Sequence, residues 1–329
     1  MNSESQDIGL CRCESRIDRY PSKGRWSGCL GLLLVLPFSI ARPDSTQTTQ
    51  AIARPFLQLL FGEGNGATAY ERFATADFIQ HNPEMGNGLK GRAAYFTARQ
   101  AGTAKRYPPP AQWANVIDNV LVDGELFAVH HHVFTGPTDV GRVFVDIWRV
   151  ADGHIVEHWD VVQSAPATLR NSNSMWCSKG SDYAAAKALN DTLAAPTCGL
   201  PDPNTSRVES LDVVAAYTQG LASGDVRGAI ERWFAPKYVQ HSPHIADGTQ
   251  AAIGYLLQQF GTGAKPMGTT ARILAQGDLV LFHRHALRAG EERGTVQADL
   301  FRVTNGKISE HWDVKQPVPA HSMNGNLMW

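Results

Sequence analysis

Histidines and aspartates recur in this 329-residue chain in matched sets that could carry out acid–base chemistry. The first set includes His132 and Asp146, and the second includes His285 and Asp299 at the corresponding positions. An imidazole and a carboxylate that face one dry cavity shift each other's pKa, which suits proton abstraction next to a carbonyl group. Matched histidines and aspartates of this kind, these four among them, are therefore candidates for catalysis.

Other histidines and aromatic residues also recur at matched positions, and we expect them to line the same cavities. These candidates for substrate binding are His81, His130, Trp148, His158, His241, His283, Phe301 and His311. A duplication also copies structural residues, so a histidine beside an aspartate can equally be a polar group of the core. A metal site is a third interpretation, because His-x-His plus a carboxylate is a workable ligand set. No Cys or Glu completes a recognised spacing, so we expect no metal and no cofactor.

The alternation of side chains along a strand predicts which histidines share a face. His130 and His132 point to one face of their strand, and His131 points to the other. In the second set Arg284 stands where the first has His131. The histidine without an equivalent is therefore predicted to face outward. The His-Trp-Asp triplet near the end of each set is interpreted as mainly structural, because its tryptophan needs a place to bury.

The matched sets belong to an internal repeat. Residues 78–83 (Phe-Ile-Gln-His-Asn-Pro) correspond to 238–243 (Tyr-Val-Gln-His-Ser-Pro), an offset of 160. Further on the offset is 153, and Glu-His-Trp-Asp-Val occurs unchanged at 157–161 and 310–314. A period of this length is typical of whole domains rather than of solenoid units.

The repeat defines the domain organisation. Copy one spans residues 51–176, copy two spans residues 206–329, and residues 177–205 form a linker. In copy two Ser206 and Asp225 are predicted to cap two helices, the second of which ends at Pro236. A third helix is expected over 249–260, followed by strands over 279–287, 295–303 and 307–314. Helices followed by an antiparallel sheet predict an α+β fold.

The N-terminal segment differs in composition from the two copies. Basic residues precede an uncharged run at 26–40, and Ser39 and Ala41 are the small residues that a signal peptidase reads. This order predicts a secretory signal peptide over residues 1–41, and hence a secreted or periplasmic protein. The apolar run is shorter than the ~20 residues of a membrane-spanning helix, so no stable membrane insertion is expected after processing.

The cysteines and the net charge of the chain indicate a disulfide and argue against nucleic acid as a binding partner. Cys177 and Cys198 are the two cysteines outside the N-terminal segment, and an exported chain would pair them as a disulfide. The formal net charge is −1, so the chain has no basic excess to attract nucleic acid.

The motifs of each copy resemble those of the SnoaL-like polyketide cyclases, which belong to the nuclear transport factor 2-like superfamily. The resemblance rests on the Gln-His-Asn/Ser-Pro motif, a His-bearing strand, an Asp-apolar-aromatic-Arg strand and the Glu-His-Trp-Asp segment. It implies two tandem cone-shaped α+β barrels, each with helices packed on a curved, mainly antiparallel sheet around a hydrophobic pocket. In the cyclases a histidine and an aspartate fourteen residues apart catalyse a cofactor-free aldol condensation. The resemblance implies that the matching catalytic residues here are His132 with Asp146 and His285 with Asp299, both fourteen residues apart. His81 and His241 match the histidine of the first motif.

Together these observations predict a cofactor-independent acid–base enzyme, a cyclase, lyase or isomerase that acts on a small hydrophobic carbonyl compound. Asp146 and Asp299 would be the general bases, and His132 and His285 would stabilise or protonate the enolate. The alternative is an exported module that binds a small ligand without catalysis. The two copies are expected to pack sheet to sheet as an internal pseudo-dimer.

Overall fold

The computed structural model describes residues 43–101, 113–177, 181–189, 192–260, 268–287 and 291–329. The expected signal peptide, residues 1–41, lies outside the described residues. Among the helices of the described ranges, none combines the length and the apolar character needed to cross a membrane.

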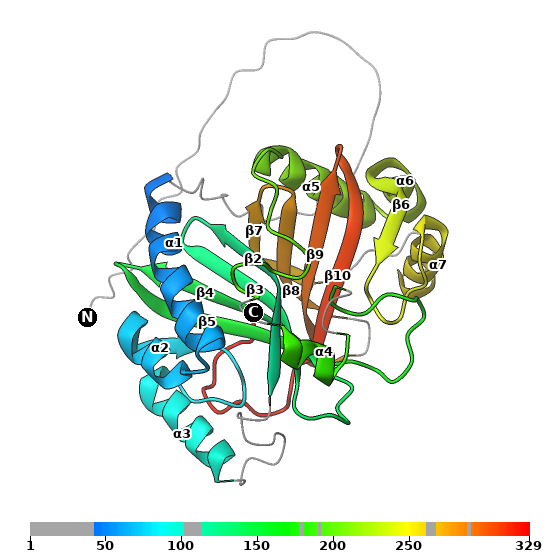
Figure 1. Ribbon diagram of the computed structural model, residues 1–329. Coiled ribbons are helices and arrows are strands. Elements are labelled where there is room, and N and C mark those ends of the chain that lie inside the picture. Colours follow the sequence, from blue (N-terminus) through cyan, green and yellow to red (C-terminus); the bar gives the residue numbers. More distant parts are fainter. Residues whose placement is uncertain (1–42, 102–112, 178–180, 190–191, 261–267, 288–290) are drawn as a thin grey trace, which may run out of the picture. The chain divides into compact units, whose positions relative to one another are not determined.

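Copy one folds into helices followed by an open five-stranded sheet (Figure 1). The strand order is β1-β5-β4-β3-β2, and every pairing is antiparallel except the parallel β1–β5 contact. Its elements are α1 (Pro43–Leu57), the π-helical turn η1 (Gln58–Gly62), α2 (Gly66–Phe73), β1 (Ala74–Gln80), α3 (Gly88–Gln100), β2 (Ala114–Asp123), β3 (Leu126–Phe134), β4 (Arg142–Ala151) and β5 (His154–Ser164).

Copy two repeats this arrangement with the strand order β6-β10-β9-β8-β7. The short helix α4 (Tyr183–Ala188) lies in the linker. The elements of copy two are α5 (Arg207–Ser223), α6 (Val226–Trp233), β6 (Phe234–Gln240), α7 (Thr249–Phe260), β7 (Gly268–Gln276), β8 (Leu279–Ala286), β9 (Thr295–Thr304) and β10 (Lys307–Pro317).

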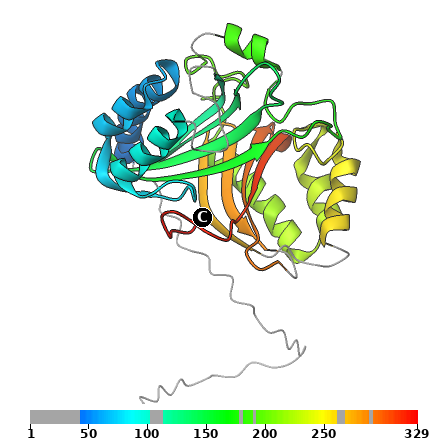
Figure 2. The ribbon, with the colours of Figure 1, turned by 90° about the horizontal axis from the view of Figure 1, so that it is seen from below.

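The α+β class is confirmed, but the expected barrels are wrong because neither sheet closes on itself. Figure 2 shows the helices of each copy on one side of that copy's own sheet. The opposite face of each sheet is also covered: buried residues of both sheets, among them Ile147 and Trp159 with Leu300 and Trp312, form one apolar cluster. Each sheet thus buries both of its faces without needing to join its edges.

Local sequence signals place the elements of copy two. The side chain of Ser206 accepts a hydrogen bond from the Glu209 amide (3.3 Å), and Asp225 accepts one from the Gly228 amide (2.9 Å), so both predicted caps are confirmed. The second helix ends at Trp233, before Pro236, which lies in strand β6 at the sheet edge, where a missing N–H is tolerated. The sequence did not reveal the two edge strands β6 and β7.

The linker is tied by a disulfide. Cys177 and Cys198 are bonded, with their Cα atoms 5.4 Å apart, and the expected pairing is confirmed. Both half-cystines pack against the apolar cluster that joins the sheets. The covalent loop therefore fixes the linker to the core.

Candidate functional site

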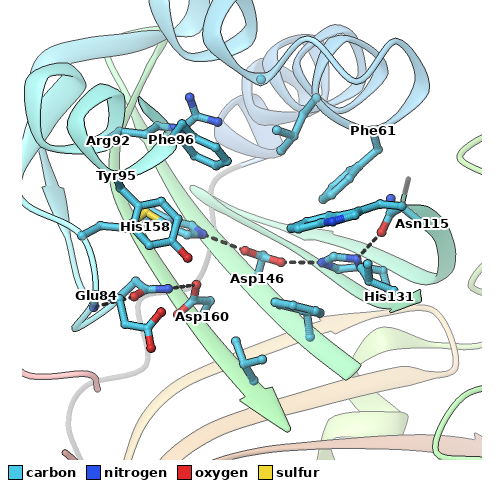
Figure 3. Close-up of a pocket in the computed structure, with 18 of the residues that line it drawn as sticks. Phe61, Glu84, Arg92, Tyr95, Phe96, Asn115, His131, Asp146, His158 and Asp160 are labelled. Carbon is cyan, nitrogen blue, oxygen red and sulfur yellow. Dashed lines mark hydrogen bonds and ion pairs between the residues drawn. The ribbon is translucent and has the colours of Figure 1, made fainter. Parts of the chain in front are cut away.

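A cavity of about 1510 Å³ lies mainly in copy one, between the sheet and the helices that cover it, and residues 316–321 of copy two and helix α4 of the linker also contribute to its wall (Figure 3). The sheet contributes two histidines and two aspartates to its wall, His131 from β3, Asp146 from β4, and His158 and Asp160 from β5, together with Arg142 of β4. On the helical side the wall contains aromatic rings, including Phe61, Tyr95 and Phe96. Acidic, basic and apolar groups thus meet in one concave space.

Strand register explains why these side chains converge. Residues paired across an antiparallel ladder point to the same face of the sheet. Asp146 pairs with Asp160, and Trp148 pairs with His158, so all four belong to the face under the helices. His131 pairs with Phe144, two residues before Asp146, and shares that face.

Asp146 is held between two imidazoles. Its Oδ2 is 2.7 Å from Nε2 of His131, and its Oδ1 is 2.9 Å from Nε2 of His158. Burial raises the pKa of this carboxyl. The hydrogen bonds and positive charge from the two histidines lower it by more than this, so the resulting pKa is about 2. Asp146 is therefore a fixed anion at neutral pH.

Asp160 is the opposite case. Burial raises its pKa to about 6, and the negative charge of Asp146 acts in the same direction, against the opposing influences of His158 and Asn82. Its Oδ2 accepts a hydrogen bond from Nδ2 of Asn82 (2.6 Å). Its Oδ1 is buried and has no hydrogen-bond partner within the described part of the chain. Asp160 can thus gain or lose a proton near neutral pH.

The ring of His158 faces an oxygen on each side. Nε2 donates to Asp146, and Nδ1 lies 3.0 Å from Oε1 of Gln80. The orientation of this amide is fixed, because Oε1 of Gln80 also accepts the Asn82 backbone N–H (2.8 Å). Both nitrogens of His158 are therefore engaged in hydrogen bonds with protein oxygens.

The same geometry bears on metal binding. Asp146, His158 and Asp160 bring their potential ligand atoms within 4.8 Å of one another, and Asp299, His311 and Asp313 do so in copy two. A metal needs a free lone pair on the imidazole. Each nitrogen of His158 already lies within hydrogen-bonding distance of an oxygen, of Asp146 or of Gln80, so a metal ion at this ring would have to replace one of these contacts.

The predicted pair of His132 with Asp146 is wrong. His132 lies on the opposite face of the sheet, where Nδ1 is 2.7 Å from Oδ2 of Asp118 and the ring stacks on Trp176 (4.5 Å). The histidine expected to face outward, His131, is the one that reaches Asp146. Alternation correctly separated His131 from its neighbours, but it could not identify the cavity face, because both faces are buried.

The predicted pair of His285 with Asp299 is wrong for the same reason. His285 stacks on Trp329 (3.8 Å), and the residue that reaches Asp299 is Arg284, with Nε 2.7 Å from Oδ2. Burial raises the pKa of Asp299, but Arg284 and His311 lower it to about 2.

The second acid of copy two is also paired with a cation. Lys315 stands at the position of Val162 in copy one and lies 2.6 Å from Asp313. A cavity of about 380 Å³ in copy two is lined by Lys315 and Tyr255 among others, but by neither Asp299 nor Asp313. Copy two therefore keeps its acids in internal ion pairs.

The other predicted lining residues divide by face. Trp148 and His158 do line the cavity of copy one, as expected. Phe301 and His311 hold the equivalent positions in copy two and stack on each other (4.7 Å).

Four predicted lining histidines belong instead to the side of each sheet that faces the other copy. His81 stacks on Trp159 (4.7 Å) and His241 on Trp312 (4.8 Å). His130 and His283 are buried and pair within their own sheets with Asn119 and Arg272. None of the four lines either of the two cavities described above.

Several residues of the site were missed as functional groups. Asp160 ends the Glu-His-Trp-Asp segment, and its unchanged repetition was a signal that could have identified it. Asn82 follows His81 in the first motif, at a position where copy two has serine. Arg92, whose guanidinium lies over the rings of Tyr70 (4.0 Å) and Phe96 (4.4 Å), gave no motif at all.

Comparison with known proteins identifies the family of the chain. A search of curated protein sequences gave no match. One similar solved structure is wild-type IdmH from Streptomyces antibioticus, with 20% sequence identity and a TM-score of 0.26 over 32% of this chain and 91% of that chain. A second is an LEH-like epoxide hydrolase from M. tuberculosis, with 18% identity and a TM-score of 0.29 over 33% of this chain and 84% of that chain. A third is an NTF2-like protein from Cytophaga hutchinsonii, with 13% identity and a TM-score of 0.28 over 35% of this chain and 95% of that chain. Each covers about the length of one copy. The family model for the SnoaL-like domain matches residues 53–158 and 214–311, and the chain therefore belongs to the SnoaL-like domain family.

Proposed function

We propose that copy one is the catalytic half of a cofactor-independent acid–base enzyme, an aldol-type cyclase, lyase or isomerase. The observation that supports this most is the pair of carboxyl groups at paired positions of neighbouring strands. The pKa of Asp146 is lowered to about 2, whereas that of Asp160 is raised to about 6. Two neighbouring acids with pKa values pushed apart are the usual arrangement for dividing fixed charge and proton transfer between two residues.

In this proposal Asp160 is the base that takes a proton from the carbon next to a carbonyl group. The C–H electron pair becomes the enolate, and the proton resides on the carboxyl of Asp160 until it returns to the product. Asp146 keeps its negative charge, raises the basicity of Asp160 and holds the rings of His131 and His158 in place. Asp146 thus remains a proposed catalytic residue, with a different role from the one the sequence indicated.

The cavity supports a hydrophobic substrate. Its volume of about 1510 Å³ exceeds the ~300–1,000 Å³ of common small-molecule sites, which leaves room for a ligand of several rings. Phe61, Phe96, Phe144 and Trp148 supply flat apolar surface along the wall. That the substrate is a carbonyl compound is inferred from the pair Asp146 and Asp160 and from the family.

A base-dependent probe reaction tests the proposal. 5-Nitrobenzisoxazole opens on loss of one C–H proton, and we expect the protein to accelerate this opening with a rate that rises as the pH increases through about 6. Asp160→Asn should lower the rate by roughly 10²-fold or more. Asp313→Asn, the matched change in copy two, should leave it unaltered.

Equal rates for Asp160→Asn and the unaltered protein would contradict the proposal. The rival function, ligand binding without catalysis, predicts that result together with a small hydrophobic molecule that copurifies unchanged. Mass spectrometry of the purified protein detects such a molecule.

A further inference from the structure

The tail that ends copy two, residues 322–329, reaches across to copy one. Nδ2 of Asn324 donates to the carbonyls of Asn82 (2.7 Å) and Met85 (2.9 Å). Nδ2 of Asn326 donates to the carbonyl of Gln80 (2.9 Å) and to Oδ1 of Asn87 (2.8 Å). These bonds hold the loop at residues 80–87, which begins at the last residue of strand β1.

The tail of copy one holds the equivalent loop of copy two in the same way. Nδ2 of Asn171 donates to the carbonyls of Ser242 and Ile245, both at 2.7 Å. Nδ2 of Asn173 donates to the carbonyl of Gln240 (2.9 Å) and to Asp247 (2.9 Å). Asn171 and Asn173 match Asn324 and Asn326 at the repeat offset of 153, so the exchange of tails is reciprocal.

The loop at 80–87 is also the one that contacts the acid–base centre. Asn82 donates from its side chain to Asp160, and Gln80 accepts from His158. The two tail asparagines bind the backbone carbonyls of these same two residues. A chain of hydrogen bonds therefore runs from copy two through the loop to the site of copy one.

The two clamps differ in what they support. In copy two the residue equivalent to Asn82 is Ser242, whose Oγ is buried and has no hydrogen-bond partner among the described residues. The nearby acid, Asp313, is paired with Lys315 instead. The clamp on copy two thus offers a natural control, with the same backbone contacts but no hydrogen bond from the Ser242 side chain to Asp313.

We propose that Asn324 and Asn326 are positioning residues for the centre in copy one, and that they act by fixing the loop from which Asn82 holds Asp160. The inference deepens the proposed function and rests on it for its catalytic meaning. The hydrogen-bond path itself stands on the contacts alone.

The experiment follows the ionisation of Asp160 directly, by ¹³C NMR of the labelled carboxyl, assigned by its loss in Asp160→Asn. Asn82→Ala removes a hydrogen bond to the charged form and should raise the titration midpoint by about one pH unit. Asn324→Ala should shift it in the same direction, whereas the matched variant Asn171→Ala should not, even where both lower the melting temperature equally.

A double variant shows whether the effect passes through Asn82. In the Asn82→Ala background, Asn324→Ala should cause no further shift, because the path is already broken. Additive shifts, or equal behaviour of Asn324→Ala and Asn171→Ala, would overturn the inference. The titration does not depend on turnover. If the protein did not catalyse the probe reaction but Asn324→Ala still raised the titration midpoint of Asp160, the proposed function would be refuted and the positioning role would stand.

Discussion

His131 and His132 are neighbours in strand β3, yet their side chains have different surroundings. His131 lies in the wall of the cavity and shares Asp146 with His158. His132 and its partner Asp118 have fully buried side chains, and Thr197 of the linker also donates to Asp118. One histidine therefore belongs to the proposed chemistry and the other to the packing of the two copies.

This difference gives opposite expectations for two alanine variants. His132→Ala leaves the Asp118 carboxylate buried without its main partner, and should lower the free energy of unfolding by about 3 kcal/mol or more. His131→Ala should cost less stability but slow the probe reaction. Urea unfolding and probe kinetics on both variants measure the two effects. Slower kinetics in His132→Ala without a loss of stability would favour the role that the sequence indicated for His132.

Only part of the site was predictable from residues and spacing. The repeat located Asp146 and His158 but left Asp160 unnoticed, and the two-residue period of a strand correctly placed His131 opposite His130 and His132. The face of the sheet that forms the cavity was not predictable, since apolar side chains such as Val145 and Phe144 occur on both faces. Hydrophobic alternation identifies an inner face only when the other face meets solvent.

At the scale of the elements, the two sheets pack through faces that contain buried histidines. His130 in β3 and His283 in β8 are each almost fully buried, and Nε2 of each has no hydrogen-bond partner in the described ranges. Burial lowers the pKa of His130 to about 4 and that of His283 to about 3, where the charge of Arg272 adds to the effect. The folded sheets thus hold both rings in the neutral form.

These rings make stability depend on pH. In the unfolded chain a histidine takes up a proton near pH 6.5, whereas the folded protein resists protonation until about pH 4 or below. The free energy of unfolding should therefore fall as the pH drops from 6.5 towards 4, by about 1.4 kcal/mol per pH unit for each histidine. His130→Phe should reduce this slope relative to the unaltered protein.

Comparing the slopes of the two proteins removes the contributions that other titrating groups make to the pH dependence of stability. Asp160 acts in the opposite direction, because its raised pKa favours proton uptake by the folded state below about pH 6. Its contribution is present in both proteins and cancels in the difference. Denaturant unfolding at several pH values measures the slopes, and identical slopes would rule out His130 as the source.

At the scale of the whole molecule, the linker is part of the structure rather than a spacer. The disulfide closes a segment of 21 residues in sequence separation, and within it Thr197 and Cys198 bond to the backbone of β2. A disulfide is typical of compartments outside the reducing cytoplasm. It therefore supports export of the chain, which we propose on the signal-like segment at 1–41.

The linker and the proposed export can be tested on one preparation. Protein recovered from the periplasm or medium should begin near residue 42 and contain no free thiol. The double variant Cys177→Ala/Cys198→Ala should lose about 3 kcal/mol of unfolding free energy, since the loop no longer restricts the unfolded chain. N-terminal sequencing, thiol titration and urea unfolding provide the measurements. Two free thiols in the mature protein would argue against both the bridge and an oxidising location.

The exchanged tails have a consequence for how the protein behaves on dilution. In an assembly of two separate chains, a site that depends on its neighbour's tail is lost when the concentration falls below the dissociation constant. Here one polypeptide carries both tails, so each loop meets its clamp at a high effective concentration that no dilution changes. Covalent linkage of the two copies thus lets one of them serve as permanent support, while its own acids remain bound to Arg284 and Lys315.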